Sequence, residues 1–229
     1  MKKVAIVQSN YIPWKGYFDL IAHVDEFIIY DDVQYTRRDW RNRNQIKTPN
    51  GQQWLTIPVI SKGKHDQLIN ETEIDGTQWA QKHWRSIESN YRKAPFFKEI
   101  SEILSPCYEQ SDLLLSKLNI SFLKTICNYL SIDTAITLST EYNGKGQKTD
   151  RLLSLCLESG ASHYVSGPSA KSYFDNQKFS ESDIDVSWFD YSGYRKYPQL
   201  WGEFVHQVSI IDLIMNCGKN GKRFLKCGE

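Results

Sequence analysis

The sequence lacks most of the features that mark secreted, membrane-spanning or metal-binding proteins. No apolar run approaches the roughly 20 residues of a transmembrane helix, and the run Val4–Val7 stops at Gln8, too early for a signal peptide. The five cysteines are odd in number and scattered, with no C-x-x-C pair, which argues against a disulfide framework and a zinc site. We therefore expect a cytoplasmic protein with no membrane span and no metal centre.

A strong charge of either sign is also missing. Lysine and arginine number 28 against 27 acidic residues, a formal net charge of +1. No general field therefore draws the chain to nucleic acid or to an anionic membrane. Walker loops, nucleophile elbows and G-x-G-x-x-G fingerprints are absent as well. With 40% hydrophobic and 24% charged residues the chain is typical of a globular protein, and we predict no nucleic-acid partner and no bound cofactor.

The first thirty residues alternate in the manner of a βαβ unit. Residues 3–8 are predicted to form a buried strand, 17–24 a helix and 27–30 a second strand, which implies a parallel pair. In open sheets of this kind, ligands bind beyond the carboxyl ends of the strands. The loop 9–16 and the pair Asp31-Asp32 both lie at such ends. We therefore expect the working surface to be built mainly from residues 8–47.

The rest of the chain continues the alternation. Strands are predicted at 54–59, 163–166 and 185–189, and helices at 77–91, 111–129, 150–159 and 209–217. Ser209 and Asp212 suggest a capping box for the last helix, and Gly218 a C-cap. The predicted fold is α/β, a mostly parallel sheet flanked by helices with a helical insertion around residues 77–130. We expect one domain over residues 1–229, with a candidate subdivision near 142–147.

The segment Val33–Thr48 concentrates arginine, lysine and amide side chains around a single acid, Asp39. Guanidinium groups bind phosphate oxygens in bidentate fashion, and amides contact sugar hydroxyls and base edges. The segment therefore suits a nucleotide or a nucleotide-sugar, with Tyr35 and Trp40 as stacking faces. The alternative is a solvated basic loop that pairs with nearby acids. The predicted substrate-binding residues here are Gln34, Tyr35, Arg37, Arg43, Asn44 and Lys47.

Large aromatic side chains crowd the loop between the first strand and the first helix. Because such side chains are costly to expose, Tyr11 and Trp14 either form a pocket wall or pack as a lid over the core. Pro13 stiffens the turn, and Gly16 permits a close approach of the backbone. We predict that Tyr11 and Trp14 bind substrate, and the aromatic lid is the alternative.

Candidates for proton transfer are the acids at a strand end and a helical histidine. Asp31 and Asp32 have the chemistry of a general base, a metal ligand or a hydroxyl acceptor, but they also suit helix caps or partners for the neighbouring arginines. His83 lies in the predicted helix 77–91, where a lone histidine is more often structural. Ser166 opens a turn after a strand, a place where anions bind. We predict Asp32 and His83 as catalytic, and Asp31 and Ser166 as substrate-binding.

Four blocks of this sequence, in order, resemble the WbqC-like family, which is found in bacterial O-antigen and polysaccharide gene clusters. They are YIPWKGYF at 11–18, DDVQY at 31–35, RNRNQIKT at 41–48 and WLTIPV at 54–59. His83 and residues 91–97, 166–167 and 209–218 fit the same pattern, so the resemblance covers nearly the whole chain. The chain departs from the family at Ser9-Asn10, where Gln-Pro usually precedes the tyrosine.

The resemblance implies a transferase that adds an acyl or aminoacyl (glycyl) group to the amine of a nucleotide-linked amino sugar in O-antigen lipopolysaccharide biosynthesis. The acyl donor would be a thioester on a carrier protein or on coenzyme A. Amine attack on a thioester needs positioning, proton removal and oxyanion stabilisation but no enzyme nucleophile. Two alternatives stay open. One is a nucleotidyltransferase-type enzyme, although no histidine occurs between Met1 and Asp19; the other is a non-catalytic binding protein of a polysaccharide assembly complex.

Overall fold

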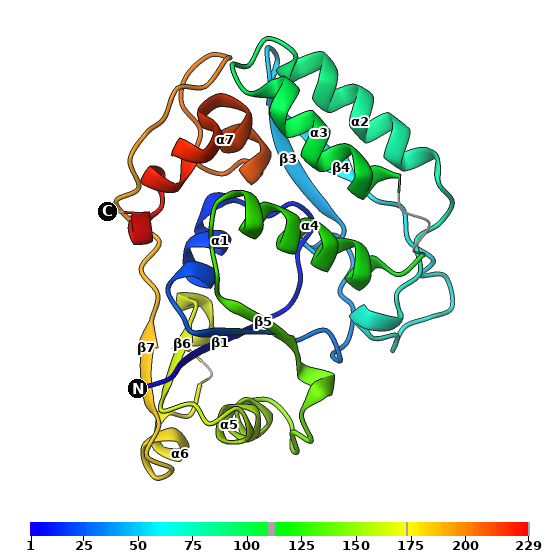
Figure 1. The fold of residues 1–229 in the computed structure, drawn as a ribbon. Helices are drawn as coiled ribbons and strands as arrows, with labels where there is room; N and C mark the ends of the chain where they lie inside the picture. Colours follow the sequence, from blue (N-terminus) through cyan, green and yellow to red (C-terminus); the bar gives the residue numbers. More distant parts are fainter. Residues whose placement is uncertain (110–112, 173, 229) are drawn as a thin grey trace.

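The computed structural model describes residues 1–109, 113–172 and 174–228. Its centre is a sheet of five parallel strands in the order β5-β2-β1-β6-β7 (Figure 1). All carboxyl ends of a parallel sheet lie at one edge, so the loops that follow the strands share that edge. The predicted α/β class is confirmed. The strands are β1 (Lys3–Val7), β2 (Glu26–Ile29), β5 (Ala135–Leu138), β6 (His163–Ser166) and β7 (Asp185–Trp188).

Helices cover both faces of the sheet because its central strands are apolar on both sides. Successive side chains of a strand point to opposite faces, so Ala5 belongs to one apolar core and its neighbours Val4 and Ile6 to another. The first core includes side chains of α1 (Lys15–Ala22), α4 (Leu115–Tyr129) and α7 (Ile210–Cys217). The second includes those of α5 (Thr149–Glu158) and α6 (Asn176–Ser180). Figure 1 shows α1 and α4 on one side of the sheet and α5 and α6 on the other.

Between β2 and β5 the chain leaves the sheet and builds a separate layer. An antiparallel hairpin, β3 (Arg43–Thr48) and β4 (Gly51–Thr56), precedes α2 (Gln78–Tyr91), α3 (Phe97–Tyr108) and α4. The predicted helical insertion is therefore present. The last part of the basic segment, Arg43–Thr48, forms the strand β3. The sequence predicted a nucleotide-binding segment there. The strand predicted at 54–59 ends at Thr56, because Pro58 has no N–H with which to extend the ladder.

Other boundaries differ in detail. The helix α3 and the short strand β5 were not predicted, and the start predicted for the helix at 111–129 falls on residues outside the described part of the chain. In α7, Ser209 is the N-cap, with its Oγ 3.2 Å from the Ile211 nitrogen, and Gly218 ends the helix at a φ of 56°. The predicted capping box is wrong, because the Asp212 carboxylate accepts a hydrogen bond from the Tyr91 hydroxyl at 2.9 Å.

The direction in which the sheet grows reverses between β1 and β6. From β1 the chain passes through α1 to β2 on one side, whereas β6 lies on the other side and continues through α6 to β7. The loops after β1 and β6 therefore diverge and leave a crevice at the carboxyl edge of the sheet. Within the described residues, no helix combines the length and the apolar character needed to cross a membrane.

Candidate functional site

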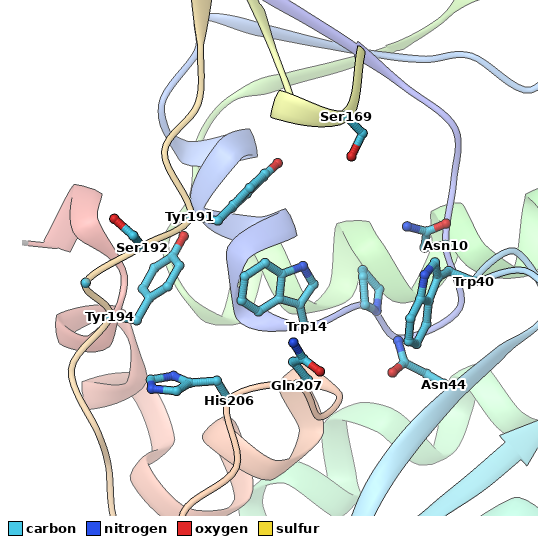
Figure 2. Close-up of a pocket in the computed structure, with 12 residues that line it drawn as sticks. Asn10, Trp14, Trp40, Asn44, Ser169, Tyr191, Ser192, Tyr194, His206 and Gln207 are labelled. Carbon is cyan, nitrogen blue, oxygen red and sulfur yellow. The ribbon is translucent and has the colours of Figure 1, made fainter. Parts of the chain in front are cut away.

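A cavity of about 870 Å³ opens at the crevice between the loops that follow β1 and β6. Figure 2 shows that its side chains come from segments far apart in the sequence. They belong to the loop after β1, the segment before and within β3, the turn after β6 and the long connection from β7 to α7. The lining residues are Asn10, Pro13, Trp14, Trp40, Asn44, Ser169, Tyr191, Ser192, Gly193, Tyr194, His206 and Gln207.

One wall of this pocket is aromatic. The centroid of the Trp14 indole lies 5.4 Å from that of Tyr191 and 5.6 Å from that of Tyr194. Trp14 is the N-cap of α1, and its ring folds back over Gly16, where an added Cβ would come within 2.3 Å of the indole. An antiparallel bridge to Ser209 joins Trp14 to the segment before α7. The wall therefore depends on glycine at position 16 and on the far end of the chain.

Buried polar groups of α1 anchor the tyrosines of this wall. The Tyr194 hydroxyl donates to the Asp19 carboxylate at 2.7 Å, and Nζ of Lys15 lies 4.9 Å from the centroid of the Tyr194 ring. This is a cation–π contact. The same Nζ donates to the carbonyl of Arg195 at 2.9 Å, and burial lowers the pKa of Lys15 to about 8. The connection from β7 to α7 is thus fixed onto the helix that follows Trp14.

Amide side chains contribute the polar part of the lining. Nδ2 of Asn44, on β3, donates to the carbonyls of Tyr11 and Ile12, both at 3.1 Å. These bonds hold a turn in which Ile12 takes a φ of 36°, a conformation that is strained for a β-branched residue. Asn10 and Gln207 add two more amides (Figure 2). The loop after β1 therefore owes its shape to the hairpin layer.

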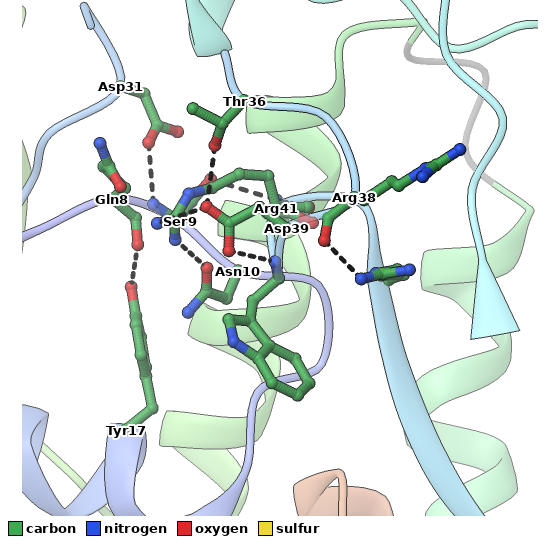
Figure 3. A network of polar contacts seen from close by, with 12 residues as sticks. Gln8, Ser9, Asn10, Tyr17, Asp31, Thr36, Arg38, Asp39 and Arg41 are labelled. Carbon is green, nitrogen blue, oxygen red and sulfur yellow. Dashed lines mark hydrogen bonds and ion pairs between the residues drawn. The ribbon is translucent and has the colours of Figure 1, made fainter. Parts of the chain in front are cut away.

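A polar network behind Asn10 joins this loop to Arg41 and Asp39 (Figure 3), and Asp39 in turn contacts the backbone of Trp40. The Arg41 guanidinium donates to the Asn10 side chain and lies 3.5 Å from the Asp39 carboxylate. Asp39 in turn accepts the Trp40 N–H at 2.7 Å, and the Tyr11 N–H donates to the Trp40 carbonyl at 3.1 Å. The backbone at Trp40 is therefore held on both sides.

His206 is the side chain of the lining best suited to proton transfer. Among the described residues that line the pocket, none carries a carboxylate, an ammonium or a guanidinium group. The imidazole packs edge-on against Phe204, with centroids 4.6 Å apart, and its buried Nδ1 has no hydrogen-bond partner in the described part of the chain. Burial, then Lys15 and Lys196, lower the pKa of His206. The ring is thus neutral near pH 7 and has a lone pair with which to accept a proton.

Two of the predicted substrate-binding residues, Trp14 and Asn44, do line the pocket. Tyr11 does not, because its side chain is fully buried and packs on Trp79 and Phe122. The aromatic turn is therefore divided, with Trp14 in the wall and Tyr11 in the core.

His83 is buried beside Tyr11 and does not line the pocket. Its Nε2 lies 3.2 Å from the Thr56 carbonyl, and its Nδ1 lies 2.9 Å from the Tyr11 hydroxyl. A carbonyl only accepts, so Nε2 carries the proton, and Nδ1 accepts from Tyr11, which accepts in turn from Tyr108 at 2.9 Å. Burial lowers the pKa of His83 to about 4. Both ring nitrogens are thus engaged in structural hydrogen bonds.

The two acids after β2 are occupied as well. Asp31 accepts from the Ser9 N–H at 2.8 Å and from the Ser116 hydroxyl, so it ties the loop after β1 to α4. Asp32 accepts from the Ser139 hydroxyl and forms an ion pair with Arg151 of α5. Neither carboxylate lines the pocket. Their position at the carboxyl edge was predicted, but their contacts are those of structural residues.

The other predicted substrate-binding side chains of residues 33–48 are dispersed. Arg37 donates to the Ser61 carbonyl at 2.6 Å, and Gln34 donates to the His65 carbonyl at 2.9 Å, both on the surface. Tyr35 is buried.

Two further residues of this set are engaged elsewhere. Lys47 is buried, and its Nζ donates to the Gln199 side chain at 2.7 Å and to the Glu203 carbonyl. Arg43 is half-buried, and its guanidinium carbon lies 4.3 Å from the centroid of Trp54.

The turn after β6 reaches the pocket through Ser169, whereas Ser166 is buried at the strand end. Sequence reasoning missed the connection from β7 to α7, which supplies Tyr191, Tyr194 and His206. A signal for it exists, because aromatic residues recur through 189–204, a stretch that forms no helix or strand. In a segment without helix or strand, aromatic side chains of this kind pack against helices or strands from other parts of the chain. Nowhere in the described residues do three or more His, Cys, Asp or Glu side chains gather as a metal site would require.

Comparison with known proteins finds similarity over almost the full length of the chain. The model of the WbqC-like protein family matches residues 8–224. The chain is 57% identical over 227 residues to "Uncharacterized protein Rv1507c" of Mycobacterium tuberculosis (strain ATCC 25618 / H37Rv), an alignment that covers 99% of this chain and 98% of that protein. No solved structure matches the chain. With every segment of the pocket inside the matched region, the chain belongs to the WbqC-like protein family.

Proposed function

We propose that this protein is an N-acyltransferase that transfers an acyl or aminoacyl group from a thioester to the amine of a nucleotide-linked amino sugar. The observation that carries the proposal is the composition of the pocket. It combines an aromatic wall, several amides and a neutral imidazole, and the described lining has no charged group that would bind a carboxylate or a metal.

The walls suit the two kinds of surface that a sugar presents. The C–H face of a pyranose packs on aromatic rings, and Trp14, Tyr191 and Tyr194 supply such faces. Amides both donate to and accept from hydroxyl groups, and Asn10 and Gln207 provide them. Apolar walls with a few placed polar groups are the usual character of small-molecule sites. A volume of about 870 Å³ accommodates a hexose with room for the acyl group.

In the proposed reaction the uncharged sugar amine attacks the thioester carbonyl, a C–N bond forms and the C–S bond breaks. His206 accepts the proton that the nitrogen loses and returns it to the departing thiolate, so the products are an amide and a thiol. Amides of the wall offer N–H donors to the oxyanion that forms on the way. The scheme needs no nucleophile from the protein. Consistent with this, burial raises the pKa of the thiols of Cys127 and Cys156 to about 12, so these cysteines are poor nucleophiles.

The electrostatics around His206 fit a proton acceptor. A pKa lowered below 6.5 keeps the ring neutral at pH 7, and the nearby ammonium groups of Lys15 and Lys196 disfavour its protonated form. The rate should therefore be constant near neutral pH and fall on the acid side of the lowered pKa, because a protonated imidazole accepts nothing. His206→Gln should reduce kcat by roughly 10²- to 10⁴-fold.

The experiment combines binding with turnover. Purified protein is titrated with nucleotide-linked 3-amino and 4-amino sugars and with the free nucleotides. It is then incubated with each sugar and either acyl-coenzyme A or an acylated carrier protein. We expect tighter binding of the amino sugar than of the nucleotide, and a product whose mass increases by the acyl group with one thiol released per turnover.

The matched control is the same nucleotide sugar with a hydroxyl group in place of the amine, which should bind without reacting. Equal affinity for sugar nucleotide and nucleotide, together with no acylated product from either donor, would remove the proposal. Release of pyrophosphate from a nucleoside triphosphate and a sugar phosphate would favour a nucleotidyltransferase in its place.

A further inference from the structure

Two tryptophans are exposed beside the pocket. Trp40 is 45% exposed and Trp54 is 41% exposed, while the other five tryptophans of the chain are buried or half-buried. An indole exposed to water lacks the stabilisation that burial of its large apolar surface would give. Neither ring is isolated, because the two centroids lie 5.5 Å apart with the planes tilted by 35°. Together they form a continuous aromatic surface, which we call the indole platform.

Arg43 belongs to the same surface. In the hairpin, Trp54 lies opposite Gln45, and side chains two residues apart on a strand share a face, so Arg43 and Trp54 are diagonal neighbours. The guanidinium carbon of Arg43 lies 4.3 Å from the centroid of Trp54. The same guanidinium donates to the carbonyl of Arg38, a residue with a φ of 60°. A planar cation is thus fixed against one tryptophan of the platform.

The platform is held in place before any ligand arrives. Asp39 accepts the Trp40 N–H at 2.7 Å and the Thr36 hydroxyl at 2.8 Å, and it also pairs with Arg41 (Figure 3). These contacts fix the short turn that presents Trp40. A surface organised in this way binds with a smaller loss of conformational freedom than a mobile one.

Two donors beside the platform have no partner within the described chain. They are the buried Nε atoms of Arg41 and Arg43, the residues that flank Asn42. A buried N–H without a partner is unfavourable, and phosphate oxygens are common partners of guanidinium groups. Because these two atoms have no exposed surface, they do not themselves contact a ligand, and the cation that this surface offers to an anionic group is the guanidinium that Arg43 places on the exposed indole of Trp54.

We propose that the indole platform, with Arg43, binds the base and the diphosphate of the nucleotide, while the pocket holds the sugar. This inference rests on the proposed function and divides the acceptor between two adjoining subsites. Trp40 lines the pocket and also belongs to the platform, so the two are continuous. The base stacks on the indoles, and the diphosphate lies by the guanidinium groups.

A base explains these features better than a second sugar does. Either ring would stack on tryptophan, but a neutral sugar offers no anionic partner to the guanidinium of Arg43 on the platform. Stacking a base on an aromatic residue tolerates any base, because every base has a π face. The platform therefore predicts affinity for nucleoside diphosphates with little preference among bases, and selectivity for the sugar arises in the pocket.

Binding of uridine diphosphate, adenosine diphosphate, inorganic pyrophosphate and free glucosamine is measured by calorimetry, without acyl donor. The variants are Trp54→Leu, Trp54→Phe and Gln53→Ala. Trp54 is substituted in preference to Trp40 because Trp40 also lines the pocket and Trp54 does not. Leucine removes the π face, phenylalanine retains one, and Gln53 lies on the opposite side of β4, where it donates to Ser86.

We expect both nucleoside diphosphates to bind wild type, and Trp54→Leu to weaken both by roughly 5- to 100-fold with little effect on pyrophosphate. Trp54→Phe should recover part of the affinity, and Gln53→Ala should bind as wild type does. Equal affinity of wild type and Trp54→Leu for the nucleoside diphosphates overturns the platform. A loss of pyrophosphate affinity as large as the loss of diphosphate affinity overturns it too, as does a loss seen only with glucosamine. If neither diphosphate binds wild type at millimolar concentration, the platform is again wrong, whereas acylation of an amino sugar would still establish the proposed function.

Discussion

Substitution of His83 tests directly whether its buried hydrogen bond with Tyr11 is structural. The perturbation is His83→Gln, which keeps an N–H for the Thr56 carbonyl but cannot titrate. In the wild type, Nδ1 accepts from Tyr11 at 2.9 Å and Nε2 faces the carbonyl at 3.2 Å. Losing the first contact and leaving the Tyr11 hydroxyl short of an acceptor should lower the free energy of unfolding by about 1–3 kcal/mol at pH 7.

The stronger prediction concerns pH. The pKa of His83 is about 4 in the folded chain, against 6.5 for an ordinary histidine. Between these values the unfolded chain binds a proton that the folded chain excludes, so acid favours unfolding. The stabilisation is complete above pH 6.5 and is lost as the pH falls toward 4. With these two pKa values, the loss between pH 7 and pH 5 is about 2 kcal/mol.

The assay is urea unfolding followed by tryptophan fluorescence at pH 5, 6 and 7. Subtraction of the two proteins cancels the titration of all groups that they share. The gap in unfolding free energy between wild type and His83→Gln should therefore shrink by about 2 kcal/mol from pH 7 to pH 5. His65→Gln is the matched control, because His65 is exposed on a surface loop. A gap that stays constant with pH would refute the buried neutral ring and would reopen a role for His83 in proton transfer.

Three further predictions concern residues around the pocket. Lys47→Met should lower the free energy of unfolding by about 1–3 kcal/mol, because it removes the hydrogen bonds of a buried ammonium group to the Gln199 side chain and the Glu203 carbonyl. Thermal unfolding measures the loss, and Lys62→Met on the surface is the control. Gly16→Ala should displace the Trp14 indole, since the new Cβ would lie 2.3 Å from the ring, so sugar-nucleotide affinity should fall while far-UV circular dichroism is retained; unchanged affinity would show that the wall does not touch the ligand. Asp32→Asn should destabilise the chain by about 1–3 kcal/mol through loss of the half-buried ion pair with Arg151. The pH dependence of turnover should not change. If turnover of the variant no longer fell at acid pH, Asp32 would be the base after all.

Local patterns were sufficient to predict much of the sheet. Strands β1 and β2 are apolar and flank a helix, so the pair and its parallel direction could be read directly from the sequence. The carboxyl-edge location of the pocket followed from that unit. Trp14 and Asn44, two of the predicted residues, line that pocket, and their contact with a ligand stays a prediction.

Long-range packing decided the rest. Lys47 and Arg43 are two cations four residues apart in one polar segment, yet one is buried against the connection before α7 and the other lies on an exposed indole. Both side chains point to the same face of β3, so only their neighbours separate them: Trp54 lies beside Arg43, and the connection before α7 covers Lys47. Nothing in the local charge pattern marks that segment as a strand. His206 was missed for a related reason. Its position in the lining depends on Lys15 and Tyr194, which anchor a segment that forms no helix or strand of its own.

The bridge between Trp14 and Ser209 has a consequence for how the protein is made. Nearly two hundred residues separate these partners along the chain, and contacts of such separation form late because a long loop must close first. During synthesis the N-terminal βαβ unit leaves the ribosome without the segment that completes its turn. The nascent chain therefore has no binding site until α7 has emerged. Products shortened before residue 209 should be inactive however well their sheet has formed, and ribosome-stalled chains of increasing length should acquire ligand binding in a single late step.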